Sequence, residues 1–249
     1  MARVLVPLAD GCEELEAVTI IDILRRAGIE VVSAGLGEGP VTASRGVVLI
    51  PDKALDDVLN EEFDMIALPG GLPGAHHLDS DPRIHALLQR MAEQDKYTAA
   101  ICAAPKVLLN AGLLDGRRAT AYPGVIDGRL AEGSQLLADA VVSDGRVITS
   151  RGPGTAMDFA LALIERLLGA DKRQEVEAPL MPPIGEMLMS FRPGKLLLLL
   201  LIPALGYGVV KGFLYYKAKR NVDGMVAAVS SQADVRYADI STDLRGAVT

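Results

Sequence analysis

The sequence is poor in cysteine, histidine and aromatic side chains. It holds two cysteines, three histidines and no tryptophan in 249 residues, and aromatic residues make up only 4 %. Two cysteines, Cys12 and Cys102, are too few for a disulfide scaffold and are typical of a reducing compartment. Positive charge is also scarce, since 25 lysines and arginines stand against 32 aspartates and glutamates, a net charge of −7. We therefore expect no nucleic-acid binding.

A secretory signal peptide is not expected either. The amino-terminal apolar run, residues 3–9, is short and is soon followed by acidic residues, which is typical of a first β-strand. One long apolar run occurs at residues 196–216, where it would span about 31 Å as a helix and ends in tyrosines followed by cations. The alternative, a buried core helix, has little polypeptide left to pack against.

We interpret residues 196–216 as a transmembrane helix. It would follow an α/β domain at residues 1–183 and a linker at 184–195, and precede a polar tail at 217–249. The cations after this segment taken alone favour a cytoplasmic tail, whereas the reduced cysteine and the lack of a signal peptide favour a cytoplasmic amino-terminal domain. We therefore expect a membrane-anchored protein whose catalytic domain faces the cytoplasm. A re-entrant hairpin bent at Pro203 is the alternative topology.

The first 170 residues alternate apolar strand-like runs with helical patterns. This alternation predicts an α/β fold, with a doubly wound, mostly parallel sheet and helices on both faces. Strands are expected at residues 3–9, 29–36, 64–69, 98–101 and 118–122, with a β-excursion at 41–51 and a hairpin at 140–150. Helices are expected at residues 13–27, 54–59, 81–94, 105–111 and 154–168.

Cys102 stands on a sharp turn between a predicted strand and a predicted helix. Pro105 suits the first turn of that helix and Gly112 the residue after its end. The positive helix terminus would favour the thiolate, which is the nucleophilic form of cysteine. A buried structural cysteine is the alternative.

Gly70 and Gly71 follow the preceding strand, so their N–H groups can approach a ligand closely. With the N–H of Ala103 they can form an oxyanion hole beside the sulfur, although a plain glycine-rich turn is the alternative. His76 and His77 follow this loop and are the candidates for a catalytic base; solvent-facing loop histidines are the simpler interpretation.

Three glutamates, Glu13, Glu14 and Glu16, open the first helix, where acidic surface residues complement the helix dipole. A carboxyl buried beside the thiolate would instead be protonated and donate a hydrogen bond to sulfur, and the pattern alone does not select which one. Cys12 can approach the same pocket and resolve an oxidised Cys102 as a disulfide, but a small residue filling a turn is the preferred interpretation.

Four ordered motifs resemble those of the ThiJ/PfpI superfamily, in particular its protein-deglycase branch, over residues 1 to about 182. They are Gly11-Cys-Glu-Glu-Leu-Glu16, Leu68-Pro-Gly-Gly71, Ala100-Ile-Cys-Ala-Ala-Pro105 and Thr149-Ser-Arg-Gly-Pro-Gly-Thr-Ala156. The resemblance implies a flavodoxin-like sandwich and a homodimer, without cofactor or metal. It also implies Cys102 as the nucleophile, Glu16 as a protonated hydrogen-bond partner, and Gly70, Gly71 and Ala103 as the oxyanion site.

The chain departs from the family pattern at two positions. Tyr122 stands before Pro123 where the animal proteins have a histidine, and a tyrosine is a poor base near neutral pH, so proton transfer would fall more heavily on Glu16. The peptidase branch has a histidine directly after the cysteine, where this chain has Ala103, which argues against a protease.

The resemblance implies a glutathione-independent glyoxalase or deglycase that acts on methylglyoxal-type α-dicarbonyls or their early glycation adducts and protects against carbonyl and oxidative stress. A non-enzymatic redox sensor or chaperone that uses Cys102 oxidation is the alternative from another class. A structural partner module that uses only the dimer surface is the third hypothesis.

Overall fold

A seven-stranded sheet forms the centre of the amino-terminal unit in the computed structural model, which describes residues 1–180, 211–212, 215–217, 219–220 and 223. The strand order is β10-β11-β7-β6-β1-β2-β5, and every pair is parallel except β10 with β11. The strands are β1 Arg3–Leu8, β2 Glu30–Gly35, β5 Lys53–Ala54, β6 Met65–Leu68, β7 Tyr97–Ile101, β10 Val141–Asp144 and β11 Val147–Ser150. The expected flavodoxin-like α/β fold is therefore confirmed.

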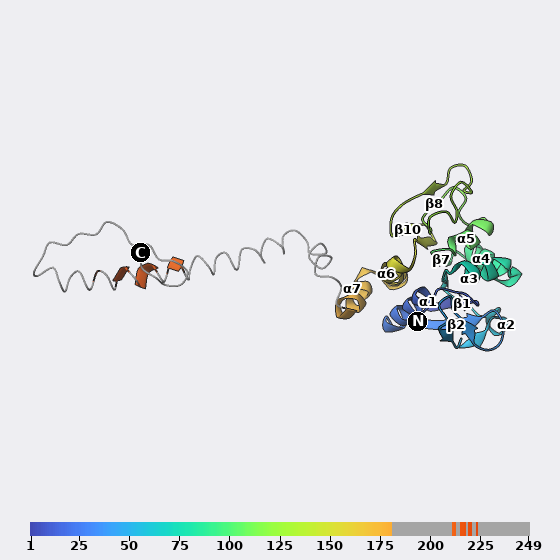
Figure 1. Ribbon diagram of the computed structural model, residues 1–249, viewed down its shortest axis with the longest axis horizontal. Helices are drawn as coiled ribbons and strands as arrows, with labels where there is room; N and C mark the ends of the chain where they lie inside the picture. Colours follow the sequence, from blue (N-terminus) through green and yellow to red (C-terminus); the bar gives the residue numbers. More distant parts are fainter. Residues whose placement is uncertain (181–210, 213–214, 218, 221–222, 224–249) are drawn as a thin grey trace, which may run out of the picture. The chain divides into compact units, whose positions relative to one another are not determined.

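Helices cover both faces of this sheet (Figure 1). On one face, α1 (Glu14–Arg26) packs against α6 (Ala156–Leu168), and α7 (Ala170–Glu177) packs against α6. The other face carries α2 (Leu55–Val58), α3 (Leu72–Ser80), α4 (Pro82–Glu93) and α5 (Pro105–Asn110). Because both faces are covered, all four residues of β6 are buried, which explains its continuous apolar sequence.

Short elements complete the unit. The strands β3 (Val41–Thr42) and β4 (Val48–Leu49) form an antiparallel hairpin, and β8 (Arg118–Ala119) pairs in parallel with β9 (Gln135–Leu136). Two 3₁₀ turns lie at Pro153–Thr155 (η1) and Ala178–Leu180 (η2).

The sheet reverses its winding at β1, which lies between β2 and β6. In doubly wound sheets, the crevice outside the carboxyl ends of the strands at this reversal is where ligands bind. The segments that leave β1, β6 and the neighbouring β7 at this edge are therefore the candidates for a functional site.

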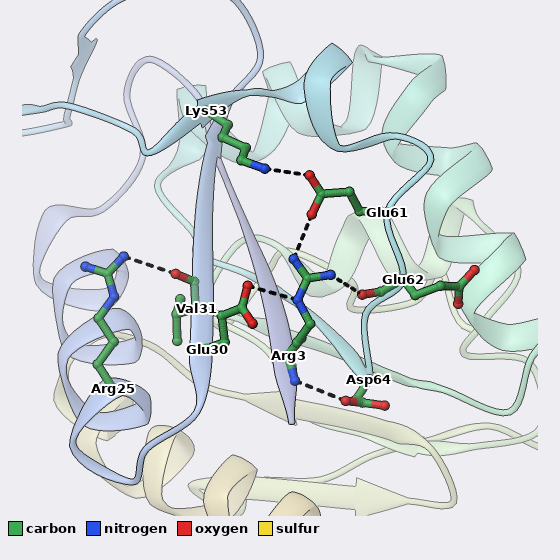
Figure 2. Close-up of polar contacts among 8 residues, drawn as sticks. All are labelled: Arg3, Arg25, Glu30, Val31, Lys53, Glu61, Glu62 and Asp64. Carbon is green, nitrogen blue, oxygen red and sulfur yellow. Dashed lines mark hydrogen bonds and ion pairs between the residues drawn. The ribbon is translucent and has the colours of Figure 1, made fainter. Parts of the chain in front are cut away.

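The opposite edge, at the amino ends of the strands, is held by an ion-pair network around Arg3 (Figure 2). Its guanidinium contacts Glu30 at 3.0 Å and Glu61 at 2.7 Å, and its backbone N–H donates to Asp64 at 3.0 Å. The same guanidinium lies 4.9 Å from the centre of the Phe63 ring. These contacts join the starts of β1 and β2 to the segment before β6.

One expected loop is a helix. Residues 72–80, which contain both candidate histidines, form α3, with Pro73 in its first turn. Proline fixes a helical φ there. Gly74 lets α3 lie against the turn that follows β1, since a Cβ on Gly74 would come within 2.6 Å of the Cys12 backbone. This tertiary contact outweighs the low helix propensity of glycine.

The expected membrane-anchored location is contradicted, and the expected transmembrane helix is not supported. A helix that crosses a bilayer needs about 20 predominantly apolar residues. No helix in the described part of the chain is long and apolar enough to do so. Within 196–216, only residues 211–212 and 215–216 are described, and they are helical and exposed. The chain divides into units at residues 1–181 and 182–249. The expected linker at 184–195 lies outside the described residues, as does most of the polar tail.

Candidate active site

Two strand ends meet at the carboxyl edge of the sheet. Strands β6 and β7 pair with Leu68 opposite Ala100, so Gly70 and Cys102 follow at equivalent positions. A Cβ built on Gly70 would lie 2.7 Å from the Cys102 Cβ and 2.7 Å from Glu16 Oε2. The two motifs that the sequence places at one edge are therefore in direct contact, and only a glycine fits at position 70.

Cys102 has a left-handed backbone, with a φ of +62°. Among the non-glycine residues that the structure describes, only Asp95 shares a positive φ. Two backbone hydrogen bonds hold this conformation: the Cys102 N–H donates to the Ser150 carbonyl at 2.9 Å, and the Tyr122 N–H donates to the Cys102 carbonyl at 2.9 Å. A strained backbone held by its surroundings is characteristic of functional residues, and here it fixes where the sulfur lies.

Glu16 is the glutamate that reaches Cys102. It is fully buried, and its Oε2 accepts a hydrogen bond from the Gly70 N–H at 2.8 Å. Its Oε1 has no hydrogen-bond partner among the described residues. Glu13 and Glu14 instead contact the Ser44 hydroxyl, each at 2.9 Å. Burial raises the pKa of the Glu16 carboxyl to about 7, so the protonated and ionised forms of this side chain are both populated at neutral pH.

The electrostatics of Cys102 differ from the expectation. Burial, followed by the negative charge of Glu16, raises the pKa of the thiol to about 12, while the N–H groups of Gly71 and Ala103 oppose this shift. The helix terminus therefore does not by itself make the thiolate. Because the carboxylate is what repels the thiolate, protonation of Glu16 removes the repulsion and supplies an O–H donor for the sulfur.

The backbone donors beside the sulfur are the N–H groups of Gly71 and Ala103. The N–H of Gly70, the third expected donor, is occupied by Glu16. Gly71 has a φ of +89°, and a Cβ there would lie 2.2 Å from the Gly11 carbonyl oxygen. The N–H of Gly71 is thus directed by a backbone conformation and a packing contact that both require glycine.

Gly152 and Tyr122 complete the surroundings of the sulfur. A Cβ on Gly152 would lie 4.0 Å from Cys102 Sγ and 3.4 Å from Cδ2 of Tyr122. Tyr122 is 51 % exposed. Gly152 lies inside one of the quoted motifs, two residues after the end of β11, but reasoning from the sequence did not single it out. Its place after a strand that pairs with β7 was the available signal.

In the part of the chain that the structure describes, no contact joins the Cys102 sulfur to the three other candidates, which are His76, His77 and Cys12. His76 and His77 lie on α3 and are exposed, and His77 Nδ1 lies 2.9 Å from the Asp10 carbonyl oxygen. Cys12 is fully buried and is a free thiol, as is Cys102. Burial raises the pKa of Cys12 to about 11, which disfavours its thiolate.

Comparison with known proteins places the chain among similar sequences. A family model described as the DJ-1/PfpI family matches residues 2–166. The Parkinson disease protein 7 homolog of Danio rerio is 44 % identical over 181 residues, which cover 72 % of this chain and 96 % of the relative. The glutathione-independent glyoxalase DJR-1.2 of Caenorhabditis elegans is 41 % identical over 179 residues, 72 % of this chain and 95 % of the relative.

Solved structures lead to the same family. The crystal structure of Drosophila melanogaster DJ-1beta superposes with a TM-score of 0.69 at 43 % identity, covering 72 % of this chain and 97 % of that one. The family match spans most of the chain, and the relatives are similar over almost their whole length. The chain therefore belongs to the DJ-1/PfpI family.

Proposed function

We propose that this protein is a cysteine-dependent, glutathione-independent glyoxalase or deglycase that acts on methylglyoxal-type α-dicarbonyls or their early glycation adducts. The observation that carries the proposal is the contact of Cys102 with a buried carboxyl, Glu16, and two backbone donors, Gly71 and Ala103. The printed name of the Caenorhabditis elegans relative, a glutathione-independent glyoxalase, supports this reaction class.

Cys102 acts as the nucleophile. Its sulfur bonds to the aldehyde carbon, and the electron pair of the C=O bond moves to the oxygen, where the N–H groups of Gly71 and Ala103 stabilise the charge. The Glu16 carboxylate takes the thiol proton as the carbon–sulfur bond forms and passes it to this oxygen, which gives a hemithioacetal and restores the carboxylate. Glu16 suits this step because its pKa, raised to about 7 by burial, lies near the working pH of a general acid–base catalyst.

The Glu16 carboxylate then removes the hydrogen from the former aldehyde carbon as a proton. That proton is returned to the neighbouring carbon, and the hydroxyl proton on the former aldehyde carbon passes to the neighbouring oxygen, which converts the adduct into a thioester of a 2-hydroxy acid. Water cleaves the carbon–sulfur bond, releasing the 2-hydroxy acid and the free thiol. Methylglyoxal and water thus give lactate with no external oxidant or reductant. Tyr122 is a secondary hydrogen-bond donor in this scheme, and Cys12 a secondary thiol.

A homodimer is part of this proposal. Exposed apolar side chains lie on α1 and on the β3–β4 hairpin, which are joined by the contacts of Ser44 with Glu13 and Glu14. They are Leu15, Val18, Val47, Val48 and Ile50, of which Ile50 is 83 % exposed. A second copy of the chain would cover this apolar surface.

The test is lactate formation from methylglyoxal without glutathione, by the full chain and three variants. We expect sustained turnover by the unmodified chain. Activity should fall by at least about 10²-fold in Glu16→Ala, as for loss of a general acid–base group, and be abolished in Cys102→Ser. His76→Ala is the matched control, because His76 is exposed on α3, and it should retain activity.

The main alternative is a redox sensor or chaperone that uses the same cysteine. Such a protein would consume no more than about one equivalent of methylglyoxal per chain, because its thiol would not be regenerated. A structural partner module would keep its role in a Cys102→Ala variant. Stoichiometric consumption would therefore refute the glyoxalase proposal.

A further inference from the structure

A gap beside the Cys102 sulfur is open because residue 152 is a glycine. A Cβ at this position would lie 4.0 Å from Cys102 Sγ, 3.4 Å from Cδ2 of Tyr122 and 3.9 Å from its Cε2. A carbon atom at this position therefore lies at ordinary van der Waals distance from both the sulfur and the aromatic ring. The φ of Gly152 is 166°, an extended conformation that any residue adopts, so the backbone itself does not require glycine here.

One boundary of this gap is the ring of Tyr122, a side chain that is 51 % exposed. The backbone of Tyr122 is held beside Cys102, because its N–H donates to the Cys102 carbonyl at 2.9 Å. The cation next to the gap in sequence, Arg151, donates to the Ala138 carbonyl at 3.2 Å. The ring carbons of Tyr122 thus offer apolar surface to a group bound near the sulfur.

We propose that the gap over Gly152, bounded by the Tyr122 ring, is the subsite for the substituent R of an α-dicarbonyl R–CO–CHO. Its apolar boundary selects alkyl and aryl substituents over the unsubstituted glyoxal. The inference rests on the proposed function, and it adds the part of the substrate that the catalytic groups do not contact.

The covalent geometry of the hemithioacetal fits this assignment. After the sulfur bonds to the aldehyde carbon, the first atom of R is three bonds away from the sulfur. Staggered torsions place it roughly 3–4 Å from the sulfur, and the vacant Cβ position of Gly152 is 4.0 Å away. An R group oriented toward Gly152 thereby contacts the Tyr122 ring and removes apolar surface from water.

The test is the ratio of kcat/KM for phenylglyoxal to kcat/KM for glyoxal, measured with the full chain by 2-hydroxy acid formation. The unmodified chain should favour phenylglyoxal by about tenfold or more, as expected when an apolar substituent enters an apolar subsite. In Gly152→Ala the new methyl group fills the gap, and the ratio should fall about tenfold. Denaturant unfolding of this variant checks that it folds.

Two tyrosine variants separate the ring from its hydroxyl. Tyr122→Phe keeps the apolar wall and should keep the ratio, whereas Tyr122→Ala removes the wall and should lower it. Leu168→Ala is the matched control: Leu168 is 40 % exposed and lies with Tyr97 at the amino end of β7, away from Cys102.

The outcomes separate the two proposals. Turnover of both substrates with no preference for phenylglyoxal, or with a ratio that Gly152→Ala and Tyr122→Ala leave unchanged, would overturn the subsite while leaving the glyoxalase intact. Absence of turnover with glyoxal, methylglyoxal and phenylglyoxal alike would overturn the proposed function and the subsite together.

Discussion

Replacing Gly71 by alanine should destabilise the protein far more than replacing a glycine with a similar backbone conformation elsewhere. Gly71 has a φ of +89°, and its new Cβ would lie 2.2 Å from the Gly11 carbonyl oxygen and 2.7 Å from the Glu13 nitrogen. Both neighbours are backbone atoms of the turn that leads into α1, so the collision cannot be relieved by a side-chain rotation.

Gly112 is the matched control. Its φ is +73°, but a Cβ there would meet nothing within 4 Å. Gly112→Ala therefore measures the cost of a left-handed alanine alone, about 1–2 kcal/mol. Gly71→Ala adds the displacement of a packed turn, about 1–3 kcal/mol by analogy with overpacked cores. We expect a total loss of about 2–5 kcal/mol in the free energy of unfolding.

The assay is urea unfolding of the full chain followed by far-ultraviolet circular dichroism, because the sequence has no tryptophan to serve as a fluorescent probe. The free energies of unfolding of the two variants are compared with that of the unmodified chain. Equal losses of unfolding free energy in Gly71→Ala and Gly112→Ala would show that the turn at Gly11 moves without cost. That result would refute the packing of the glycine loop against this turn.

Two further predictions concern the pH dependence and the dimer. Burial raises the pKa of Glu16 from 4.5 to about 7, so between these values the folded chain keeps a proton that the unfolded chain releases, and stability falls as pH rises through this window. The full loss is about 3 kcal/mol. Unfolding at pH 5 and pH 8 should show that Glu16→Gln lacks this loss, and a pH dependence identical to that of the unmodified chain would contradict the assignment. Val48 is 58 % exposed on β4, so Val48→Asp should reduce the solution mass from twice the 26.3 kDa of one chain to a single copy. Light scattering measures that mass, and a single-chain mass for the unmodified protein would exclude the dimer.

Local sequence signals were enough for most of the fold. Asp81 and Pro82 predict the start of α4, and in the structure the Asp81 carboxylate accepts the Arg83 N–H at 2.9 Å. Such caps act within one turn of helix, so they can be recognised without tertiary information. The helix α3 could not be recognised from the sequence, because a glycine and two histidines weaken its helical pattern. Packing of Gly74 against Cys12 stabilises this helix in the folded chain.

The sequence by itself determined the order of the strands and helices, and with it the edge at which the glycine loop and Cys102 meet. Hydrophobic runs and the chirality of parallel connections are sufficient for that step. The residue pattern did not select among Glu13, Glu14 and Glu16, although the family resemblance indicated Glu16. The tertiary structure supplies the physical reason, because the Gly70 N–H reaches the Glu16 carboxyl across the fold. It also reversed the expected effect on the Cys102 pKa, since burial and a neighbouring carboxyl are properties of the folded chain and not of the residues along it.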